Sequence, residues 1–251
     1  MSIRDHKINK FVPIPLYYQL KSIILEEMAK GNYLPGDMIP TEKEISEFFQ
    51  LSRTTVRQAI TELVQEGKLY RFKSKGTYIA KPKIVQDFIK KVETYNDQIK
   101  RLGMVPSTKL LERKVIMPPQ DVAGVLKLKD GQQCISILRK RLANNEPNVV
   151  VRTYLPYDIC SFIMDHDLES ESIYKILSVQ EKTQVHHINR IVEAVLATEE
   201  DARMLDIDVG QPIHFFTSIG FNTANEPIEY SLARYRGDRN RFEVELYYQP
   251  E

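Results

Sequence analysis

The first third of the chain places apolar residues at helical spacing between polar loops. A stripe at intervals of three and four residues begins after Pro15 and predicts a helix that ends at Gly31. The members of this stripe are Leu16, Leu20, Ile23, Ile24 and Met28. Thr41 and Glu44 form a capping-box pattern, which predicts a second, shorter helix ending near Gln50. The residues it is expected to bury are Ile45, Phe48 and Phe49.

A third helix is expected from the N-cap Ser52 to Gly67. Its apolar face comprises Val56, Ala59, Ile60, Leu63 and Val64. After it, the β-prone runs "KLYRF" and "TYIAK" are joined by "KSKG", which predicts a hairpin. Helix, short helix, turn, helix and basic hairpin together describe a winged helix-turn-helix.

Polar side chains gather at the N-terminal end of the third helix, where a recognition helix contacts DNA. Ser52 with Thr54 or Thr55 can donate to phosphate oxygens, and Arg53 and Arg57 have the fork geometry for guanine or phosphate. Lys73, Lys75 and Gly76 form the hairpin tip, which can lie along the backbone or in the minor groove. Any one of these residues alone would fit an ordinary solvated helix. The combination favours DNA binding.

The remainder of the chain repeats one pattern twice. "LKLKDGQQCISILRKRLANNEPNVVVRTYLP" and "LDIDVGQPIHFFTSIGFNTANEPIEYSLARYRGD" each contain a short helix, a strand, a turn ending in Glu-Pro and a returning strand. Two such units predict an antiparallel sheet with a pseudo-twofold axis. The final "RFEVELYYQ" is expected to be another strand. The fold class is therefore α+β, with a DNA-binding domain at 1–82, a linker at 83–90 and a second domain at 91–251.

Charge divides the 251-residue chain in the same way. Residues 1–83 hold 14 Lys+Arg and 9 Asp+Glu, and the remainder holds 21 and 25, so a net charge of +1 hides a basic and an acidic part. This division favours a polyanion as partner of the first part only, although a solvated charged surface would also account for it.

Two arginines of the first repeat suggest an anion site. Arg139 and Arg141 are two residues apart on one strand, so they share a face, whereas the equivalent positions in the second repeat are about Ser218 and Gly220. Facing solvent they would be ordinary surface residues; facing a cavity they would suit a phosphate or carboxylate. Helices expected to start at Thr94 and Ser172 could add backbone N–H groups, or these two residues could simply cap their helices.

The sequence also resembles a known family. Residues 12–81, especially "SRTTVRQAI", "EGKLYR" and "KGTYI", resemble the DNA-binding domain of the GntR family of bacterial transcription regulators. The resemblance implies DNA contacts from Thr41, Ser52, Arg53, Thr55, Arg57, Gln58, Gly76 and Thr77.

The second part resembles the UTRA effector domain of the HutC subfamily, which has a chorismate-lyase-like fold. The matching segments include "RKRLANNEP", "SIYKIL", "ATEEDARMLDIDVGQP" and "PIEYSLARYRGDR". Some members bind sugar phosphates. The resemblance implies phosphate contacts from Thr94, Tyr95, Asn96, Arg139, Arg141, Ser172 and Tyr174, and sugar contacts from Glu229 and Tyr235.

One position departs from this pattern. Many relatives carry a ligand-binding glutamate where this chain has Val151, followed by Arg152. We therefore expect a phosphorylated sugar that needs no amine or amide recognition and can carry extra negative charge, with Arg152 as a further candidate contact.

Other classes of protein are less consistent with the sequence. It contains no catalytic triad order, phosphate-binding glycine loop or metal-spaced cluster, and the adjacent His186 and His187 would face opposite sides of a strand. Cys134 and Cys160 are expected to be free thiols of a cytoplasmic protein with no signal peptide or membrane span. An enzyme of chorismate-lyase-like fold, an RNA-binding or nucleoid protein, and a regulator of a non-sugar acidic metabolite remain as alternatives. The favoured interpretation is a homodimeric repressor of carbohydrate genes that binds a palindromic operator and needs no cofactor or metal.

Overall fold

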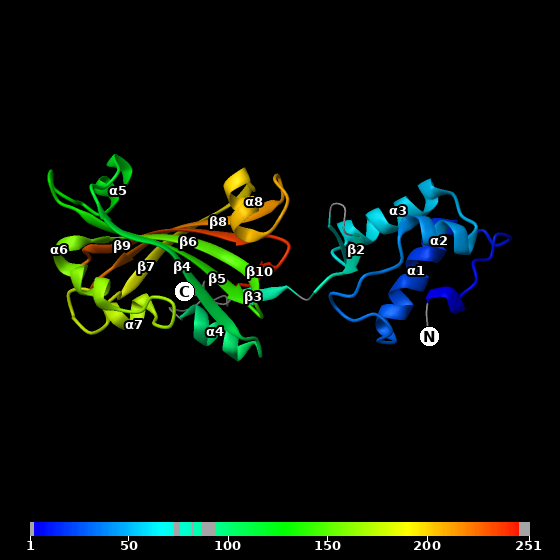
Figure 1. The fold of residues 1–251 in the computed structure, drawn as a ribbon, viewed down its shortest axis with the longest axis horizontal. Coiled ribbons are helices and arrows are strands. Elements are labelled where there is room, and N and C mark those ends of the chain that lie inside the picture. Colours follow the sequence, from blue (N-terminus) through cyan, green and yellow to red (C-terminus); the bar gives the residue numbers. More distant parts are fainter. Residues whose placement is uncertain (1–2, 73–75, 82, 87–93, 246–251) are drawn as a thin grey trace, which may run out of the picture. The chain divides into compact units, whose positions relative to one another are not determined.

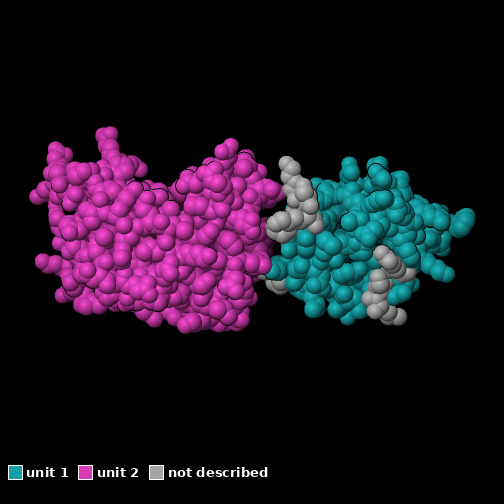
Figure 2. All heavy atoms as spheres, viewed as in Figure 1, with its two compact units in different colours: residues 1–82 teal, residues 83–251 magenta. Residues whose placement is uncertain are grey.

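The structure is a computed structural model that describes residues 3–72, 76–81, 83–86 and 94–245 (Figure 1). The chain divides into two compact units, Met1–Pro82 and Lys83–Glu251, which Figure 2 distinguishes by colour. Each unit has its own buried apolar cores. The two are therefore described separately.

The first unit is the expected winged helix-turn-helix. It contains a short 3-10 turn at Ile3–Asp5 and the elements α1 (Leu16–Ala29), α2 (Glu42–Phe49), α3 (Arg53–Gln65), β1 (Leu69–Phe72) and β2 (Gly76–Ile79). The three helices and the antiparallel β1–β2 hairpin enclose one core, in which Leu20, Ile24 and Ile60 are fully buried. Phe48 differs from its expectation, because 44% of it is exposed while Phe49 fills the core.

Both expected helix caps are present. The Thr41 hydroxyl accepts from the Glu44 N–H at 3.3 Å, and the Glu44 carboxylate accepts from the Thr41 N–H at 2.8 Å. Gln50 ends α2 with a left-handed φ of 50°, and Ser52 then caps α3. This tight connection directs α3 away from α2 and leaves the start of α3 at the surface.

The second unit is built on a six-stranded antiparallel sheet with strand order β4-β5-β6-β9-β8-β7. The strands are β4 (Pro106–Ile116), β5 (Cys134–Ala143), β6 (Glu146–Pro156), β7 (His187–Leu196), β8 (Pro212–Phe221) and β9 (Pro227–Arg236). Two three-stranded halves, β4-β5-β6 and β7-β8-β9, meet where β6 pairs with β9. The expected duplication is confirmed, and each copy also includes the strand before its helix.

Short helices cover both faces of this sheet (Figure 1). They are α4 (Tyr95–Arg101), α5 (Gln120–Val125), α6 (Tyr157–Cys160), α7 (Ile173–Leu177) and α8 (Glu199–Leu205), with a 3-10 turn at Ser161–Asp165. On one face, Leu205 of α8 packs with Val150 and Ile213. On the other, Ile173 and Ile176 of α7 pack with Ile137.

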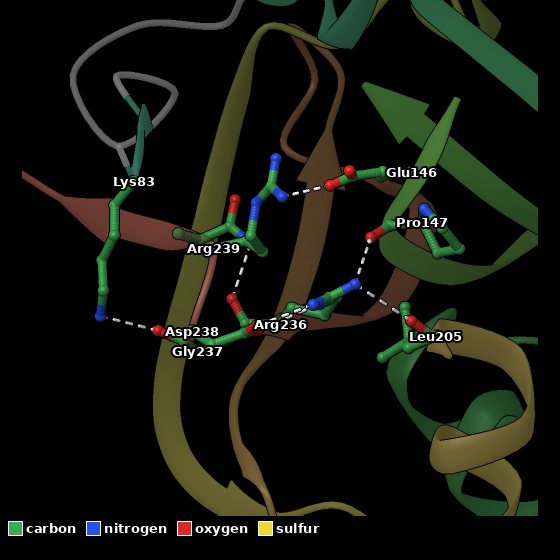
Figure 3. A network of polar contacts seen from close by, with 9 residues as sticks. Lys83, Glu146, Pro147, Leu205, Arg236, Gly237, Asp238 and Arg239 are labelled. Atoms are coloured by element: carbon green, nitrogen blue, oxygen red, sulfur yellow. Dashed lines mark hydrogen bonds and ion pairs between the residues drawn. The ribbon is translucent and has the colours of Figure 1, made fainter. Parts of the chain in front are cut away.

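The described part of the expected linker contains a strand. β3 (Ile84–Gln86) pairs in parallel with β10 (Asn240–Phe242). Polar contacts hold this segment against the end of β9 (Figure 3): Lys83 Nζ donates to the Gly237 carbonyl at 2.9 Å, and Arg239 nearby forms an ion pair with Glu146. The last predicted strand is shorter than expected, because within the described residues only its start, in β10, is a strand.

Candidate DNA interface and effector cavity

The start of α3 presents its polar side chains to the surface because its apolar face is used by the core. Val56, Ala59 and Ile60 are fully buried, whereas Arg53 and Thr54 are exposed. Ser52 Oγ accepts from the Thr55 N–H at 3.1 Å and lies 2.8 Å from Thr55 Oγ1. The cap thus fixes the first turn, and the arginine beside it extends into solvent.

Glu42 connects the third helix and the wing. Its two carboxylate oxygens accept from Arg57 Nε at 3.2 Å and from Arg71 Nη2 at 2.9 Å. Arg57 remains 68% exposed in its side chain, so the pair is a surface contact of small energetic value. The two guanidinium groups are therefore held close together and remain accessible to a larger anion.

The other candidate DNA contacts are spread around this surface. Gln58 Nε2 donates to Glu62 at 3.3 Å, and the Thr41 hydroxyl serves the cap of α2. Gly76 and Thr77 lie on β2. Lys73 and Lys75 lie outside the described residues.

A cavity lies on one face of the second unit's sheet, beneath the starts of α4 and α7. Eight of the ten predicted effector residues line it: Thr94, Tyr95, Arg139, Arg141, Ser172, Tyr174, Glu229 and Tyr235. The strand register explains this convergence. Arg139 is opposite Val151 on β6, Val151 is opposite Ala233 on β9, and residues directly opposite in antiparallel strands share a face.

Arg139 is the cation of this cavity with the least access to water. Only 4% of the residue is exposed, and its Nε and Nη1 atoms have no hydrogen-bond partner among the described residues. Burial, with a smaller contribution from the neighbouring Arg141, lowers the pKa of Arg139 well below its usual value. An arginine nevertheless remains charged in proteins. A buried guanidinium with unsatisfied N–H groups is costly, and Glu229 is the one carboxyl group among the described residues that line the cavity, so an anion entering the cavity would relieve that cost.

Arg141 is held against an aromatic ring. Its guanidinium carbon lies 5.1 Å from the centre of the Tyr95 ring, within cation–π range. Burial is also the main reason why the pKa of Tyr95 is raised, so this phenol stays neutral. The two arginines thus present two forks to the same space.

The carboxyl group of Glu229 lies in the same cavity as these two arginines. Tyr174 Oη donates to Glu229 Oε2 at 2.9 Å, and only 4% of Glu229 is exposed. Burial raises the pKa of Glu229, although hydrogen bonds from Tyr174 and Ser231 and the charges of Arg190 and Arg139 lower it in part. Gly220 leaves room for this side chain, because a Cβ atom at that position would lie 3.1 Å from Glu229 Oε2.

The two helix starts differ in what their hydroxyl groups do. Thr94 caps α4, since its Oγ1 accepts from the Asp97 N–H at 3.2 Å and donates to the Asp97 carboxylate at 2.6 Å. Ser172 precedes α7 without a side-chain cap hydrogen bond. The capping interpretation therefore describes Thr94, whereas the Ser172 side chain does not cap its helix.

Two predicted effector residues are not among those that line the cavity. Arg152 pairs across the sheet with Leu138 and points to the opposite face, where its Nη1 donates to Glu112 at 2.6 Å and to Ser136 Oγ at 2.9 Å. The expectation of an Arg152 contact is wrong because strand alternation places it away from Val151. Asn96 lies on α4, also outside the lining.

Sequence reasoning missed several lining residues. Arg190 on β7 is the most important of them, and its Nε donates to Ser218 Oγ at 2.9 Å. The others are Gln98, Thr153, Ile173, Phe216, Ser218, Ser231 and Ala233. Val151, which the sequence marks as the position of a ligand-binding glutamate in relatives, also lines the cavity. The sequence identifies Ser218 only as the counterpart of Arg139. Ser218 is opposite Ser231 on β9, and this strand register places it on the face of the cavity.

Metal and thiol chemistry have little basis in the structure. Among the described residues no group of three or more His, Cys, Asp or Glu side chains is placed to hold a metal ion. His187 instead stacks on Phe221, with 4.7 Å between ring centres. Cys134 and Cys160 are free and buried. No helix in the described ranges is long and apolar enough to cross a membrane.

The fold and the two sites define a bacterial DNA-binding regulator with a separate ligand-binding domain. Residues 16–79 match the model of bacterial regulatory proteins of the gntR family, and residues 101–241 match the UTRA domain. The chain belongs to the GntR family and to its HutC-like group, and it is a transcriptional regulator of the repressor type rather than an enzyme.

Curated and solved relatives agree with this assignment. The HTH-type transcriptional repressor NagR of Bacillus subtilis is 31% identical over 235 residues, covering 94% of this chain and 96% of the relative. The probable fructoselysine utilization operon repressor of Escherichia coli K12 is 25% identical, covering 89% and 91%. The crystal structure of PhnF from Mycobacterium smegmatis superimposes with a TM-score of 0.64 at 24% identity, covering 91% of this chain and 99% of that one. This likeness shows the fold alone.

Proposed function

We propose that the effector of this repressor is a small phosphorylated sugar and that its binding lowers operator affinity. The observation that carries the proposal is Arg139, a buried guanidinium beside Arg141 on the same strand face. Two of its nitrogens have no hydrogen-bond partner among the residues that the structure describes. Two adjacent guanidinium forks match the oxygens of a phosphate group.

The remaining lining favours a sugar over a non-sugar acidic metabolite. Glu229, Ser231 and Thr153 provide a carboxyl and two hydroxyl groups in the same cavity, and such groups pair with sugar hydroxyls. Several relatives are named for carbohydrate systems, including fructoselysine utilization and mannosyl-D-glycerate transport and metabolism. Carbohydrate genes are therefore the proposed targets.

The proposed DNA contacts are made by α3 and the wing. Arg53 and Arg57 would contact base edges or phosphates in the major groove, and Ser52, Thr54 and Thr55 would contact the backbone near the helix start. Thr41, Gln58, Gly76 and Thr77 are proposed as further contacts. A single helix-turn-helix contacts one half-site, so a palindromic operator requires two copies of the chain.

The second unit supports a homodimer through its β7 edge. β7 is a ten-residue outer strand with exposed apolar side chains, among them Ile191 at 58%, Val192 at 46% and Leu196 at 70% exposed. The opposite outer strand, β4, carries charged residues and a β-bulge after Leu110. Charges and bulges discourage strand pairing, whereas an apolar edge favours it. We therefore assign the dimer contact to β7.

A route for the response runs from the cavity through α4. Tyr95 lines the cavity and packs in the same cluster as Ile84 of β3, and Gln98 Nε2 donates to the Val85 carbonyl at 3.4 Å. Ligand contact with Tyr95 would thus act on the strand that follows the DNA-binding unit. A substitution at Val85 would not test this contact, because the acceptor is its backbone carbonyl and Val85→Pro would also break the strand. Because Gln98 also lines the cavity, calorimetry on Gln98→Ala measures its effect on ligand affinity separately. At saturating ligand, Gln98→Ala should still show reduced operator release; full release would exclude this contact.

The phosphate assignment is tested by calorimetry with matched ligands. Glucose 6-phosphate and fructose 6-phosphate should bind measurably, while glucose and fructose should not. Ligand that binds only the folded state also raises the melting temperature, which gives a second readout. Tighter binding of an unphosphorylated sugar would reject the proposal.

A further inference from the structure

Arg190 is a third guanidinium group of the effector cavity, and it enters from a different side. β7 and β5 are separated by β6, β9 and β8, so their backbones are about 19 Å apart at the usual strand spacing. Arg139 and Arg141 approach from β5, whereas Arg190 approaches from β7 and is held by its 2.9 Å hydrogen bond to Ser218 Oγ. The cationic groups therefore border the cavity on two sides.

Glu229 lies within electrostatic range of both sides. The charges of Arg190 and of Arg139 each lower the pKa of its carboxyl, against the larger effect of burial. Among the described lining residues there are three arginines and this one carboxyl group. Glu229 also accepts the hydrogen bond of Tyr174, so a single shared acid faces cations from two directions.

A single phosphate group is small compared with this arrangement. A phosphate group bound by Arg139 and Arg141 would balance the positive charge on the β5 side of the cavity. Arg190, on the β7 side, would then face the rest of the ligand. Arg190 is half-buried, and the fork of its guanidinium group best matches a carboxylate or phosphate. Between the two sides lie Thr153 and Ser231, which suit the hydroxyl groups of a sugar chain.

We propose that the effector carries two acidic groups, a phosphate at Arg139 and Arg141 and a second carboxylate or phosphate at Arg190. This inference rests on the proposed function, because it assumes that the cavity binds a phosphorylated sugar. It narrows the ligand class to sugar-acid phosphates and sugar bisphosphates. Ser218 is then a positioning residue, which orients the guanidinium of Arg190 toward the ligand.

Matched ligand pairs test the second acidic group. Glucose 6-phosphate and 6-phosphogluconate differ at the end remote from the phosphate, where the latter has a carboxylate. Fructose 6-phosphate and fructose 1,6-bisphosphate differ by a second phosphate. Calorimetry on the full-length protein should show that the doubly acidic member of at least one pair binds at least tenfold more tightly. Equal affinity within both pairs would overturn the inference.

Variants assign that preference to Arg190. In Arg190→Gln the ratio of affinities within the preferred pair should fall to about one, because the doubly acidic ligand loses more affinity than the singly phosphorylated one. Ser218→Ala should reduce the ratio partly, which provides a second variant should Arg190→Gln fail to fold. A ratio that is unchanged in both variants would contradict the assignment.

The same data separate this inference from the proposed function. Equal affinity within both pairs for the wild-type protein, with phosphate binding retained, would remove only the second acidic group. Binding of gluconate that exceeds binding of both phosphorylated ligands, or an affinity that does not change in Arg139→Met, would remove the phosphate site itself and with it both proposals.

Discussion

The two units use arginine in opposite environments. Arg53 at the start of α3 is exposed, and Arg57 keeps 68% of its side chain accessible although it pairs with Glu42. Arg139 in the second unit is 4% exposed, with two nitrogens that have no partner in the described structure. An exposed guanidinium can meet a partner as large as a DNA backbone, whereas a buried one accepts only an anion small enough to enter. The two units therefore suit partners of different size because their arginines differ in burial, although the residue type is the same.

The largest effect is expected from removing the buried charge. Arg139→Met should lower affinity for a phosphorylated hexose at least 100-fold, because charge-assisted hydrogen bonds worth about 1.5–3 kcal/mol each are lost. Two nitrogens of the buried Arg139 have no hydrogen-bond partner among the described residues, so its removal relieves a desolvation cost and the melting temperature of the free protein should stay equal or rise. Calorimetry and thermal unfolding measure the two effects. A large drop in melting temperature would contradict the view that the N–H groups of Arg139 are unsatisfied in the free protein.

Arg53→Met is the matched change at the surface. Operator affinity should fall about 10- to 100-fold, as expected for a contact worth about 1–3 kcal/mol. Ligand affinity should not change. Fluorescence anisotropy with a labelled duplex, at one fixed salt concentration, measures the loss. Unaltered operator binding would remove Arg53 from the interface.

Glu42→Gln would release the exposed guanidinium groups of Arg57 and Arg71 from their ion pairs. Arg57 and Arg71 would lose their shared carboxylate, and one negative charge would leave the proposed DNA surface. Operator affinity should rise about two- to fivefold, with a steeper dependence on salt because phosphate contacts strengthen. Glu47→Gln on the same helix is the control, since its pair with Lys43 spans 3.9 Å and is largely exposed. A decrease in affinity would show that Glu42 positions the arginines for DNA.

The ion pair between the half-buried Arg234 and the buried Asp201 in the second unit affects stability rather than binding. Burial alone would raise the pKa of Asp201, but hydrogen bonds from Thr198 and Arg234 and the Arg234 charge outweigh it and lower the pKa below its usual value. A lowered pKa adds stability above the unfolded value, about 3.9, and this contribution is lost as pH falls through the folded value. Asp201→Asn should therefore lower the free energy of unfolding at pH 7 by about 1–2 kcal/mol and less at pH 3. A constant difference between pH 7 and pH 3 would contradict this assignment.

Local patterns in the sequence predicted much of this structure. Apolar residues such as Leu20, Ile24 and Ile60 recur at helical spacing within their own helices, which is a short-range signal. The caps at Thr41 and Ser52 are also short-range signals, and the observed helices follow them closely. The duplicated segments likewise predicted the two halves of the sheet. Strand alternation was enough to place Arg139 and Arg141 on one face.

Features that depend on pairing between strands far apart in the sequence could not be predicted. Alternation places Arg152 and Val151 on opposite faces, but which of the two faces the cavity depends on how β6 pairs with β5 and β9. Arg190 lies on an outer strand, and the sequence of that strand, HINRIVEAVL, does not alternate regularly between polar and apolar residues, so it contains no sign that Arg190 faces a cavity. β3 exists because β10 pairs with it, and the two are more than 150 residues apart.

The central claim is that the buried cations of the second unit control DNA binding by the exposed cations of the first. It is tested most directly by titrating the labelled promoter region of the protein's own gene with wild type and Arg139→Met, each with and without a phosphorylated hexose. The account predicts that the ligand weakens operator binding by wild type at least fivefold and leaves Arg139→Met unaffected. Equal release of both proteins by the ligand, or of neither by any phosphorylated sugar, would contradict it.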